Sequence, residues 1–190
     1  MGLSAGLYLL LLAAVATGRL VEMRVSRRNQ QRLAVQGIAK ITAPHFRWMV
    51  LLHIGVLAGA GLEVVFLRRP FIPVLAVLMG LLFLFSNLMR WWVIRTLAGH
   101  WNVEVMASSR LGAITSGPYR WIRHPNYVAV YIELISLPLI HTAWLTAIVA
   151  ALGNAWVLAR RVAMEEAVLL ADPGYRASMG GKPRFVPGLF

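Results

Sequence analysis

The densest group of potentially reactive side chains lies in segment 117–127, whose sequence is GPYRWIRHPNY. Its Gly-Pro pair predicts a turn, and Pro125 suits the first position of a helix. A helix that begins there presents free backbone amides, which attract an anion such as a carboxylate. Because Arg123 and His124 stand immediately before this helix, they would strengthen the attraction. The segment therefore predicts an anion-binding helix start.

Two tyrosines complete this motif. The ring faces of Tyr119 and Tyr127 can pack on a heterocyclic base or on a sulfonium cation. Arginine, tryptophan and tyrosine also anchor helices at a membrane boundary, so no single residue here distinguishes a binding site from an interfacial anchor. Their combination at one helix start favours the binding site.

A second candidate is the segment RRVAMEE at 160–166. On a helix, Arg161 and Glu165 are four residues apart and share a face. They would form an exposed salt bridge of small energy, or they would present a cation and a carboxylate to a pocket. The sequence contains only seven acidic residues, so an adjacent pair is notable. The residues alone leave both interpretations open.

Charged residues within apolar runs form a third group. Arg90 and Arg95 lie in the run 71–97, and Glu133 lies in a later one. Ionisable side chains inside a membrane span are functional candidates by default. Arg95 can instead extend to the membrane surface, whereas Arg90 lies deeper. Arg90 and Glu133 are a candidate internal pair.

The composition is typical of a membrane protein. Of 190 residues, 59% are hydrophobic and 14% are charged, whereas soluble domains average about 45–50% and about 25%. The absence of cysteine excludes disulfides, thiol nucleophiles and cysteine zinc sites. His53 and His141 stand without further ligands, so we expect no metal site. The net charge of +12 suits nucleic acid or a membrane surface, and the apolar content favours the membrane and no nucleic acid.

The apolar runs predict an all-α, polytopic membrane protein with five transmembrane helices. Crossing the hydrocarbon core takes about 20 residues. The predicted helices cover residues 3–28, 49–67, 71–97, 126–140 and 142–166 of a single domain, 1–190. The fourth is short and meets the fifth at His141, which indicates a tight helical hairpin whose full span stays open.

Loop charges predict the orientation. Segments 19–47, 110–123 and 160–184 hold 15 basic residues, whereas the opposite side holds only Arg68 and Arg69. The basic side is expected to be cytoplasmic. An odd number of spans then places the N-terminus outside and the C-terminus in the cytoplasm.

The motif at 117–127, followed by the Glu165-Glu166 pair, resembles the isoprenylcysteine carboxyl methyltransferase family and the related membrane phospholipid methyltransferases. The resemblance covers roughly the C-terminal half, with a weaker pattern over 161–187. It implies a helical membrane enzyme that uses S-adenosylmethionine (SAM) and releases S-adenosyl-L-homocysteine. The cofactor site would face the cytoplasm and be built from residues 100–127 and 160–190.

Positions that match the family motif are implied to contact the cofactor: Glu104, Leu111, Gly112, Ala113, Ile114, Tyr119, His124, Pro125, Asn126, Tyr127 and Glu165. Arg161 would face the methyl acceptor. The sequence departs from the eukaryotic pattern at Leu111, where those enzymes carry histidine, and at Glu104, where they carry an amide. Backbone contacts at 111–114 would survive the first change.

The methyl acceptor is less constrained. A prenylcysteine carboxylate is ionised near pH 7 and needs no base, whereas a phenolic hydroxyl, with a pKa near 10, needs one. Candidate catalytic residues are accordingly Arg161, to position the acceptor, and Glu165 or Glu133 as a base. If either glutamate is the base, its glutamine variant would still bind the cofactor but lose turnover.

Further segments resemble a bacterial subgroup that O-methylates alkylresorcinols or alkylpyrones made by type III polyketide synthases. They are EMRVSRRN at 22–29, RWWVIRTL at 90–97, WN at 101–102 and HTAWLT at 141–146. This resemblance implies a lipophilic acceptor that enters from the bilayer, with its head group near Arg90, Arg95 and Arg161. It also implies a functional link to such a synthase and a place in the bacterial inner membrane, with membrane lipids as neighbours.

Two other classes stay open from the residues alone. A small transporter or channel would use Arg90 and Glu133 as its pathway, although a compact polar motif at one surface is poor evidence for a pore. A non-catalytic membrane subunit would use its arginine-rich loops to hold anionic lipid or a partner protein. Cofactor binding distinguishes the enzyme from both.

Overall fold

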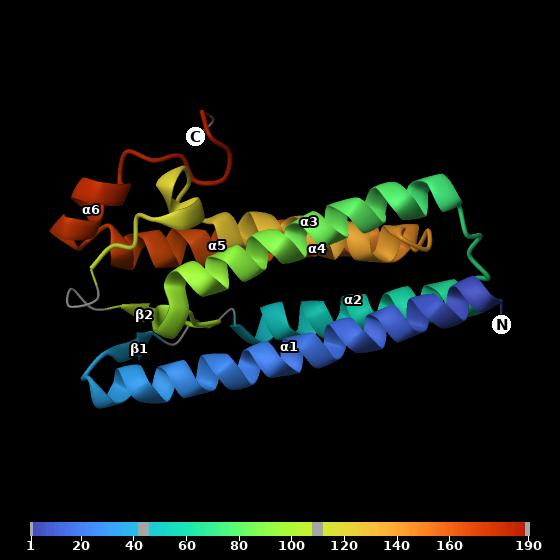
Figure 1. The fold of residues 1–190 in the computed structure, drawn as a ribbon, viewed down its shortest axis with the longest axis horizontal. Helices are drawn as coiled ribbons and strands as arrows, with labels where there is room; N and C mark the ends of the chain where they lie inside the picture. The colour runs from blue at the N-terminus through green and yellow to red at the C-terminus, as the bar shows by residue number, and fades with distance from the viewer. Residues whose placement is uncertain (1, 42–45, 108–111, 189–190) are drawn as a thin grey trace.

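The computed structural model describes residues 2–41, 46–107 and 112–188, which form a bundle of helices (Figure 1). Its α-helices are α1 (Leu3–Val35), α2 (Phe46–Phe66), α3 (Pro73–Leu97), α4 (Pro125–Leu139), α5 (Trp144–Leu169) and α6 (Pro173–Met179). Shorter elements are the 3-10 turns η1 (Ala98–His100) and η2 (Gly117–Arg120) and the strands β1 (Ala39–Ile41) and β2 (Val105–Ala107). The N-terminus lies at one end of the bundle, and the strands and α6 lie at the other.

The five predicted helices are all present within a few residues, except that the first continues to Val35. Four helices are long and apolar enough to cross a membrane, namely α1, α2, α5 and α3 with its η1 extension. The α4 helix has 15 residues, or about 22 Å at 1.5 Å per residue, which is shorter than the roughly 30 Å hydrocarbon core. Four of the five predicted spans therefore meet the length that crossing requires.

The helical fold class is confirmed, with one addition that the apolar periodicity did not predict. Strands β1 and β2 pair antiparallel, with Ala39 opposite Ala107. They bring the segment after α1 against the segment after α3. Each strand has only three residues, too few for an alternating pattern to reveal it in the sequence.

Close packing joins α3 to α4, α4 to α5, α2 to α5, and α1 to α2. Near the N-terminal end, Tyr8 and Leu12 of α1 meet Ala60 and Val64 of α2 in a buried cluster. The Tyr8 hydroxyl donates to the Leu137 carbonyl of α4 at 3.0 Å. These contacts fix α1 to the bundle at that end.

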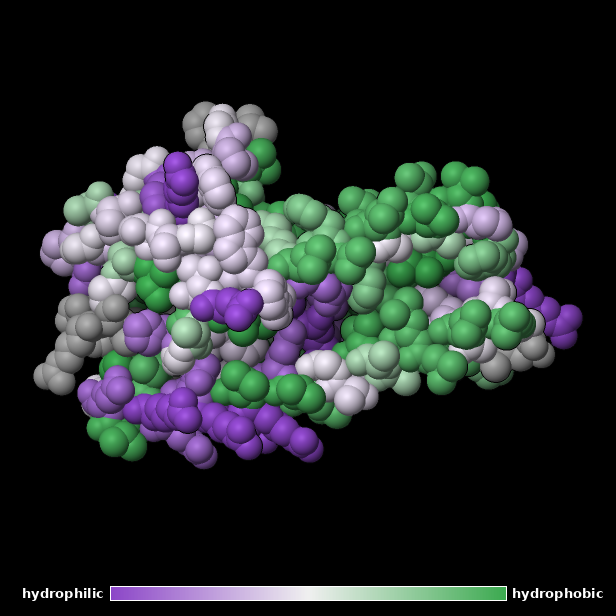
Figure 2. All heavy atoms as spheres, in the orientation of Figure 1, coloured by the Kyte–Doolittle hydropathy of each residue, from purple (hydrophilic) through white to green (hydrophobic). Residues whose placement is uncertain are grey.

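Apolar side chains cover most of the visible face in the half of the bundle that is farther from the sheet and α6, whereas hydrophilic side chains gather in the other half (Figure 2). On α3, Leu81, Leu84 and Phe85 are all exposed. An exposed apolar surface of this extent is stable only against lipid or another apolar surface. The hydropathy of the spans and this surface together identify an integral membrane protein.

Two buried polar side chains attach α1 to the loop after α3. The Asn29 amide donates to the Trp101 carbonyl at 2.7 Å, and the Ser26 hydroxyl accepts from the Val103 amide at 3.0 Å. Trp101 itself is 2% exposed. The loop that follows α3 is therefore held by α1 as well as by the sheet.

Glu63 organises the opposite end of the bundle. Its carboxylate accepts from the backbone amides of Leu145 and Thr146 in the first turn of α5, at 3.1 and 2.8 Å. It also accepts from the Thr146 hydroxyl at 2.8 Å and pairs with Arg69 at 2.8 Å. One buried carboxylate thus fixes the start of α5 to α2 and satisfies amides that no helical carbonyl reaches.

Replacing Glu63 by alanine is therefore expected to destabilise the protein. Glu63→Ala leaves the Thr146 amide and the Arg69 guanidinium unpaired, and we expect a loss of about 3 kcal/mol. Thermal unfolding of the detergent-purified protein measures this loss as a lower midpoint. Arg69→Met is the matched control and should cost less, because the Arg69 side chain is 26% exposed and can be solvated. Equal midpoints for wild type and Glu63→Ala would contradict the role.

Candidate active site

A cavity of about 480 Å³ lies at the end of the bundle that carries the sheet and α6. Its walls come from the end of α3, the loop 100–104, the motif 117–127, the last turns of α5, and α6. Segments that are far apart in the sequence therefore meet around one space. Predicted site residues that line it are Glu104, Gly112, Ile114, Tyr119, His124, Asn126, Tyr127, Arg161 and Glu165.

Other predicted residues lie elsewhere. Ala113 and Pro125 are neighbours of lining residues but do not themselves line the cavity. Leu111 lies outside the described residues. Arg90 and Arg95, which are predicted to bind the acceptor, do not line the cavity, and neither does Glu133, the candidate catalytic base. Their predicted roles in binding or catalysis stay predictions.

The predicted helix start is confirmed, because α4 begins at Pro125. Before it, Gly117 has a φ of +56°, and a Cβ there would approach Thr96 Oγ1 to 2.3 Å. Only glycine fits this approach of η2 to α3. The close contact holds Tyr119 at the cavity wall.

Tyr127 links the two residues that the sequence places on one face of α5. Its hydroxyl donates to the Glu165 carboxylate and accepts from Arg161 Nε at 2.7 Å. The Arg161 guanidinium also lies 5.4 Å from the centroid of the Tyr127 ring. Arg161 and Glu165 are thus held by a buried phenol from α4, and do not form an exposed surface salt bridge.

Arg161 is fixed by two further elements. Its side chain donates to Met49 Sδ of α2 at 2.9 Å and to the Val103 carbonyl of the loop after α3. The residue is only 8% exposed. A guanidinium held by α2, α4 and a loop keeps a fixed direction toward the cavity, which is what positioning a reactant requires.

Two more tyrosines of the cavity stay protonated at physiological pH. Burial, and then the nearby Glu165 carboxylate, raise the pKa of Tyr175 to about 12. Burial likewise raises the pKa of Tyr119 well above its usual value. Both hydroxyls therefore serve as hydrogen-bond donors or acceptors and not as bases.

Glu166 is the centre of a buried ion network beside the cavity. Its carboxylate contacts His124 Nε2 at 3.0 Å, Arg123 Nη1 at 3.2 Å and Arg184 Nη2 at 2.7 Å. The anion that the sequence predicts beside Arg123 and His124 is, in this structure, the protein's own Glu166. A ligand carboxylate would therefore meet Arg123 and His124 already paired with Glu166.

The C-terminal segment closes onto the motif through its backbone. The Arg123 amide donates to the Pro183 carbonyl at 2.9 Å, and the His124 amide donates to the Arg184 carbonyl at 3.0 Å. Lys182 Nζ donates to the Tyr119 carbonyl at 2.7 Å. These contacts hold the tail against the cavity wall just before the start of α4.

The sequence reasoning missed Glu166 and Arg184 as site residues. Glu166 was visible as half of the Glu-Glu pair, but the two glutamates are neighbours on a helix and so point in different directions. Glu165 faces Tyr127 and Glu166 faces His124. Arg184 is near a chain end, where residue type gives no signal of its partner.

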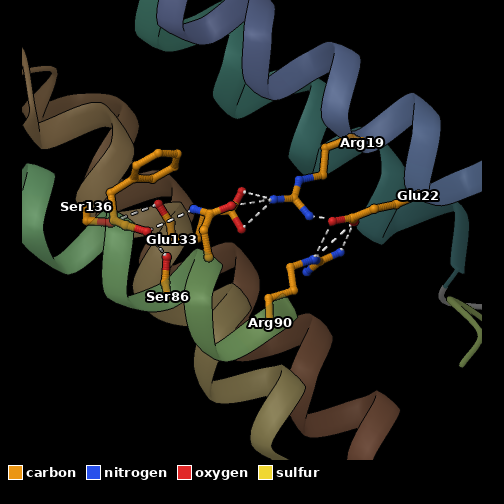
Figure 3. Close-up of polar contacts among 8 residues, drawn as sticks. Arg19, Glu22, Ser86, Arg90, Glu133 and Ser136 are labelled. Carbon is orange, nitrogen blue, oxygen red and sulfur yellow. Dashed lines mark hydrogen bonds and ion pairs between the residues drawn. The ribbon is translucent and has the colours of Figure 1, made fainter. Parts of the chain in front are cut away.

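A second polar group lies deeper in the bundle (Figure 3). Arg19 contacts Glu133 at 2.9 Å and Glu22 at 2.5 Å, and Glu22 contacts Arg90 at 2.6 Å. We call these four residues the four-residue ion cluster. The candidate pair of Arg90 with Glu133 is corrected, because α1 inserts Arg19 and Glu22 between them. Periodicity along single helices cannot reveal an insertion from a third helix.

The cavity residues fit a cofactor that carries amino and hydroxyl groups. Asn102 Oδ1 and Asn126 Oδ1 are buried without a hydrogen-bond partner, and both residues line the cavity. Buried carbonyl oxygens of this kind need a donor, which an amino or hydroxyl group would supply. Among the described residues no group of histidine, cysteine or acidic side chains could hold a metal.

Fold and site together define a helical membrane protein with a polar, aromatic-lined cavity at one end of its bundle. A family model described as the isoprenylcysteine carboxyl methyltransferase (ICMT) family matches residues 77–171, which is half of the 190 residues. The chain belongs to this family of membrane methyltransferases. The matched range runs from α3 through α5 and leaves α1 outside.

Two relatives extend the comparison. The "Uncharacterized protein YpbQ" of Bacillus subtilis (strain 168) is 26% identical over 167 residues, which cover 86% of this chain and 96% of that protein. The solved structure of the eukaryotic intramembrane Ras methyltransferase ICMT superposes with a TM-score of 0.61 at 22% identity. The match covers 78% of this chain and 55% of that one, so this chain spans about half of its length. The likeness shows a common fold.

The ion network of Glu166 gives a direct prediction about the tail. In Glu166→Gln the ion pairs with Arg184 and Arg123 are lost, so the tail should leave the motif more often. We expect hydrogen exchange of the Arg123 and His124 amides to rise roughly tenfold, since exchange reports local opening. Arg160→Gln, nearly two helical turns earlier and exposed, is the control and should leave these amides protected. Unchanged exchange in Glu166→Gln would contradict the tail's dependence on this carboxylate.

Proposed function

We propose that this protein is a SAM-dependent methyltransferase that methylates an oxygen atom of a lipophilic acceptor. The observation that carries the proposal is the cavity, where the family motif, Arg161 and Glu165 meet around buried carbonyl oxygens without partners. When bound, SAM supplies the electrophilic methyl group. The residues of this chain bind and orient the reactants and exclude water.

Each part of the cavity suits a part of the cofactor. The side-chain oxygens of Asn102 and Asn126 accept hydrogen bonds from its amino or hydroxyl groups. Tyr119 and Tyr127 offer ring faces to its base or sulfonium. The carboxylate of Glu165 adds negative charge beside that cation. S-adenosyl-L-homocysteine, the product, lacks the sulfonium charge and would bind the same residues.

The acceptor is proposed to come from the bilayer. Its polar head would lie against Arg161, which is already oriented by Tyr127 and Met49, and much of the rate would come from near-attack placement. Arg90 and Arg95 would lie along the approach. A hydroxyl acceptor needs a base, for which Glu165 and Glu133 are the candidates.

Alkylresorcinols and alkylpyrones are proposed acceptors because of the subgroup resemblance, and a type III polyketide synthase would then supply them. A carboxylate on an isoprenoid lipid is the alternative within the same reaction class. The proposed location is the bacterial inner membrane, with the cavity facing the cytoplasm.

Calorimetric titration with SAM tests the cofactor. Wild type in lipid nanodiscs should bind, and Glu165→Gln should bind about tenfold more weakly, a loss of about 1.4 kcal/mol, because it removes the carboxylate beside the sulfonium. Asn126→Ala should also weaken binding by removing an acceptor oxygen. Arg28→Gln, exposed on α1, is the control and should bind as wild type does. Absence of binding by folded wild type would refute the proposal.

The proposed orientation follows from the basic segments that cluster at the cavity end. Because the chain contains no cysteine, single cysteines can report it without background. Gly181 has nothing within 4 Å of an added Cβ and lies at the cavity end, whereas Gly2 precedes α1 at the other end.

In intact bacterial cells, a membrane-impermeant maleimide should label Gly2→Cys and leave Gly181→Cys unlabelled. In inside-out vesicles the pattern should reverse. Labelling of both residues from the same side would contradict an odd number of crossings and the proposed orientation.

A further inference from the structure

The four-residue ion cluster lies on the path between the cavity and the bilayer. Arg90 of α3 is seven residues before Leu97, and Glu133 of α4 is seven residues after Asn126. Seven residues are close to two helical turns, about 10 Å along the axis, so each pair shares a face of its helix. Leu97 and Asn126 both line the cavity. The faces that line the cavity therefore continue, two turns deeper, to the cluster.

The first helix repeats this arrangement. Glu22 is seven residues before Asn29, and Asn29 donates to the carbonyl of Trp101, a residue of the cavity wall. Two helices, α3 and α4, thus line the cavity at one level and the cluster at the next, and α1 contacts the cavity wall and the cluster with the same spacing.

At the level of the cluster, α1 and α3 are bridged by long charged side chains. The contacts are Glu22 with Arg90, and Arg19 with Asn87 at 3.3 Å. Figure 2 shows hydrophilic atoms in a recess between two apolar surfaces near the middle of the molecule. The side chains of Glu22 and Arg19 are 21% and 17% exposed, and the neighbouring Leu20 is strongly exposed. The cluster is therefore accessible from the lipid side.

Helix attachment alone does not require these charges. Buried ion pairs are often no more stable than apolar residues of similar volume, and ionisable groups at bilayer depth are costly. Tyr8 and Leu12 fix the same helix by apolar packing at its other end. A polar group of a ligand that moves through this recess, or binds in it, would explain the charges.

The charges of the cluster also limit what that group can be. Two arginines and two glutamates sum to zero, so an entering carboxylate would add an unbalanced negative charge in a medium of low dielectric constant. A hydroxyl adds none. It can donate to Glu22 and accept from Arg19 Nε, which is buried and has no hydrogen-bond partner.

We propose that the four-residue ion cluster binds the uncharged, hydroxyl-bearing head group of a long-chain lipid that enters between α1 and α3. This inference rests on the proposed function, and it selects a phenolic or enolic acceptor over a carboxylate. The alkyl chain stays in the bilayer beside Leu20, which is strongly exposed. From the cluster, the head group moves two helical turns along the shared faces to Arg161.

Photo-crosslinking in lipid nanodiscs tests the site without depending on turnover. One probe is a 5-alkylresorcinol with a diazirine next to its ring, and the other is an S-prenylated N-acylcysteine with the same photophore and a free carboxylate. The resorcinol probe is expected to label segments 15–26 and 83–94, roughly tenfold more than the carboxylate probe. Equal or stronger labelling there by the carboxylate probe would overturn the proposed class of head group.

The double variant Glu22→Leu with Arg90→Met tests the charges. It leaves Arg19 paired with Glu133, so the remaining charges still balance, and apolar replacement of an ion pair should preserve the unfolding midpoint. We expect labelling by the resorcinol probe to fall roughly tenfold while SAM binding is unchanged. Arg69→Met, which removes a charge from the far end of the bundle, is the matched control and should label as wild type does.

Two outcomes separate the site from the proposed function. Labelling of the double variant at the wild-type level, with SAM still bound, would overturn the head-group site and leave the methyltransferase intact. Failure of wild type to bind SAM, with labelling of 15–26 and 83–94 that the double variant loses, would overturn the proposed function and leave the lipid site standing.

Discussion

Each buried carboxylate of this protein joins segments that would otherwise separate. The cation or amide that it contacts determines which segments are joined. Glu63 fixes α2 to the start of α5, Glu133 and Glu22 connect α4, α1 and α3 through Arg19 and Arg90, and Glu166 holds the tail and the motif to α5. In hydrocarbon an unpaired charge is costly, so each carboxylate constrains its partners strongly. Because the chain has only seven acidic residues for 19 basic ones, the positions of the acidic residues determine which arginines form ion pairs within the bundle.

This constraint explains how a short chain builds a cavity at one end of a bundle of nearly parallel helices. The walls come from segments that have little apolar surface to pack together. Tyr127, shared between Arg161 and Glu165, fixes α4 to α5, and Ser26 and Asn29 fix the loop after α3 to α1. Polar contacts of this kind have direction, so they hold the side chains of the cavity in place as well as the helices. A reaction that depends on placement benefits from that rigidity.

The family match and the ion cluster concern different parts of the chain. The match begins at residue 77, and so includes the motif and the Glu-Glu pair but leaves out α1. Arg19 and Glu22, which complete the ion cluster, come from α1. Most of the cavity wall therefore comes from the matched part, with α6 added beyond it, whereas the proposed approach from the bilayer also depends on a helix before it.

Much of the fold was predictable from the sequence, because its signals are local. Runs of apolar residues mark the spans within a few positions, and Pro125 marks the start of α4. The motif at 117–127 and the pair Arg161 and Glu165 predict most of the cavity wall, since those residues share short segments or one helical face. The β1–β2 sheet was not predictable, because three residues per strand carry no measurable periodicity.

The sequence by itself determined the helical membrane class, the basic side of the chain and the segments that make the site. The tertiary structure alone decided the partners of the charges. It paired Glu166 with His124 where the sequence left room for a ligand's carboxylate, and it placed Arg19 and Glu22 between Arg90 and Glu133. The physical reason is that hydropathy and helical spacing act along one element, whereas an ion pair depends on which other helix comes within about 4 Å of it.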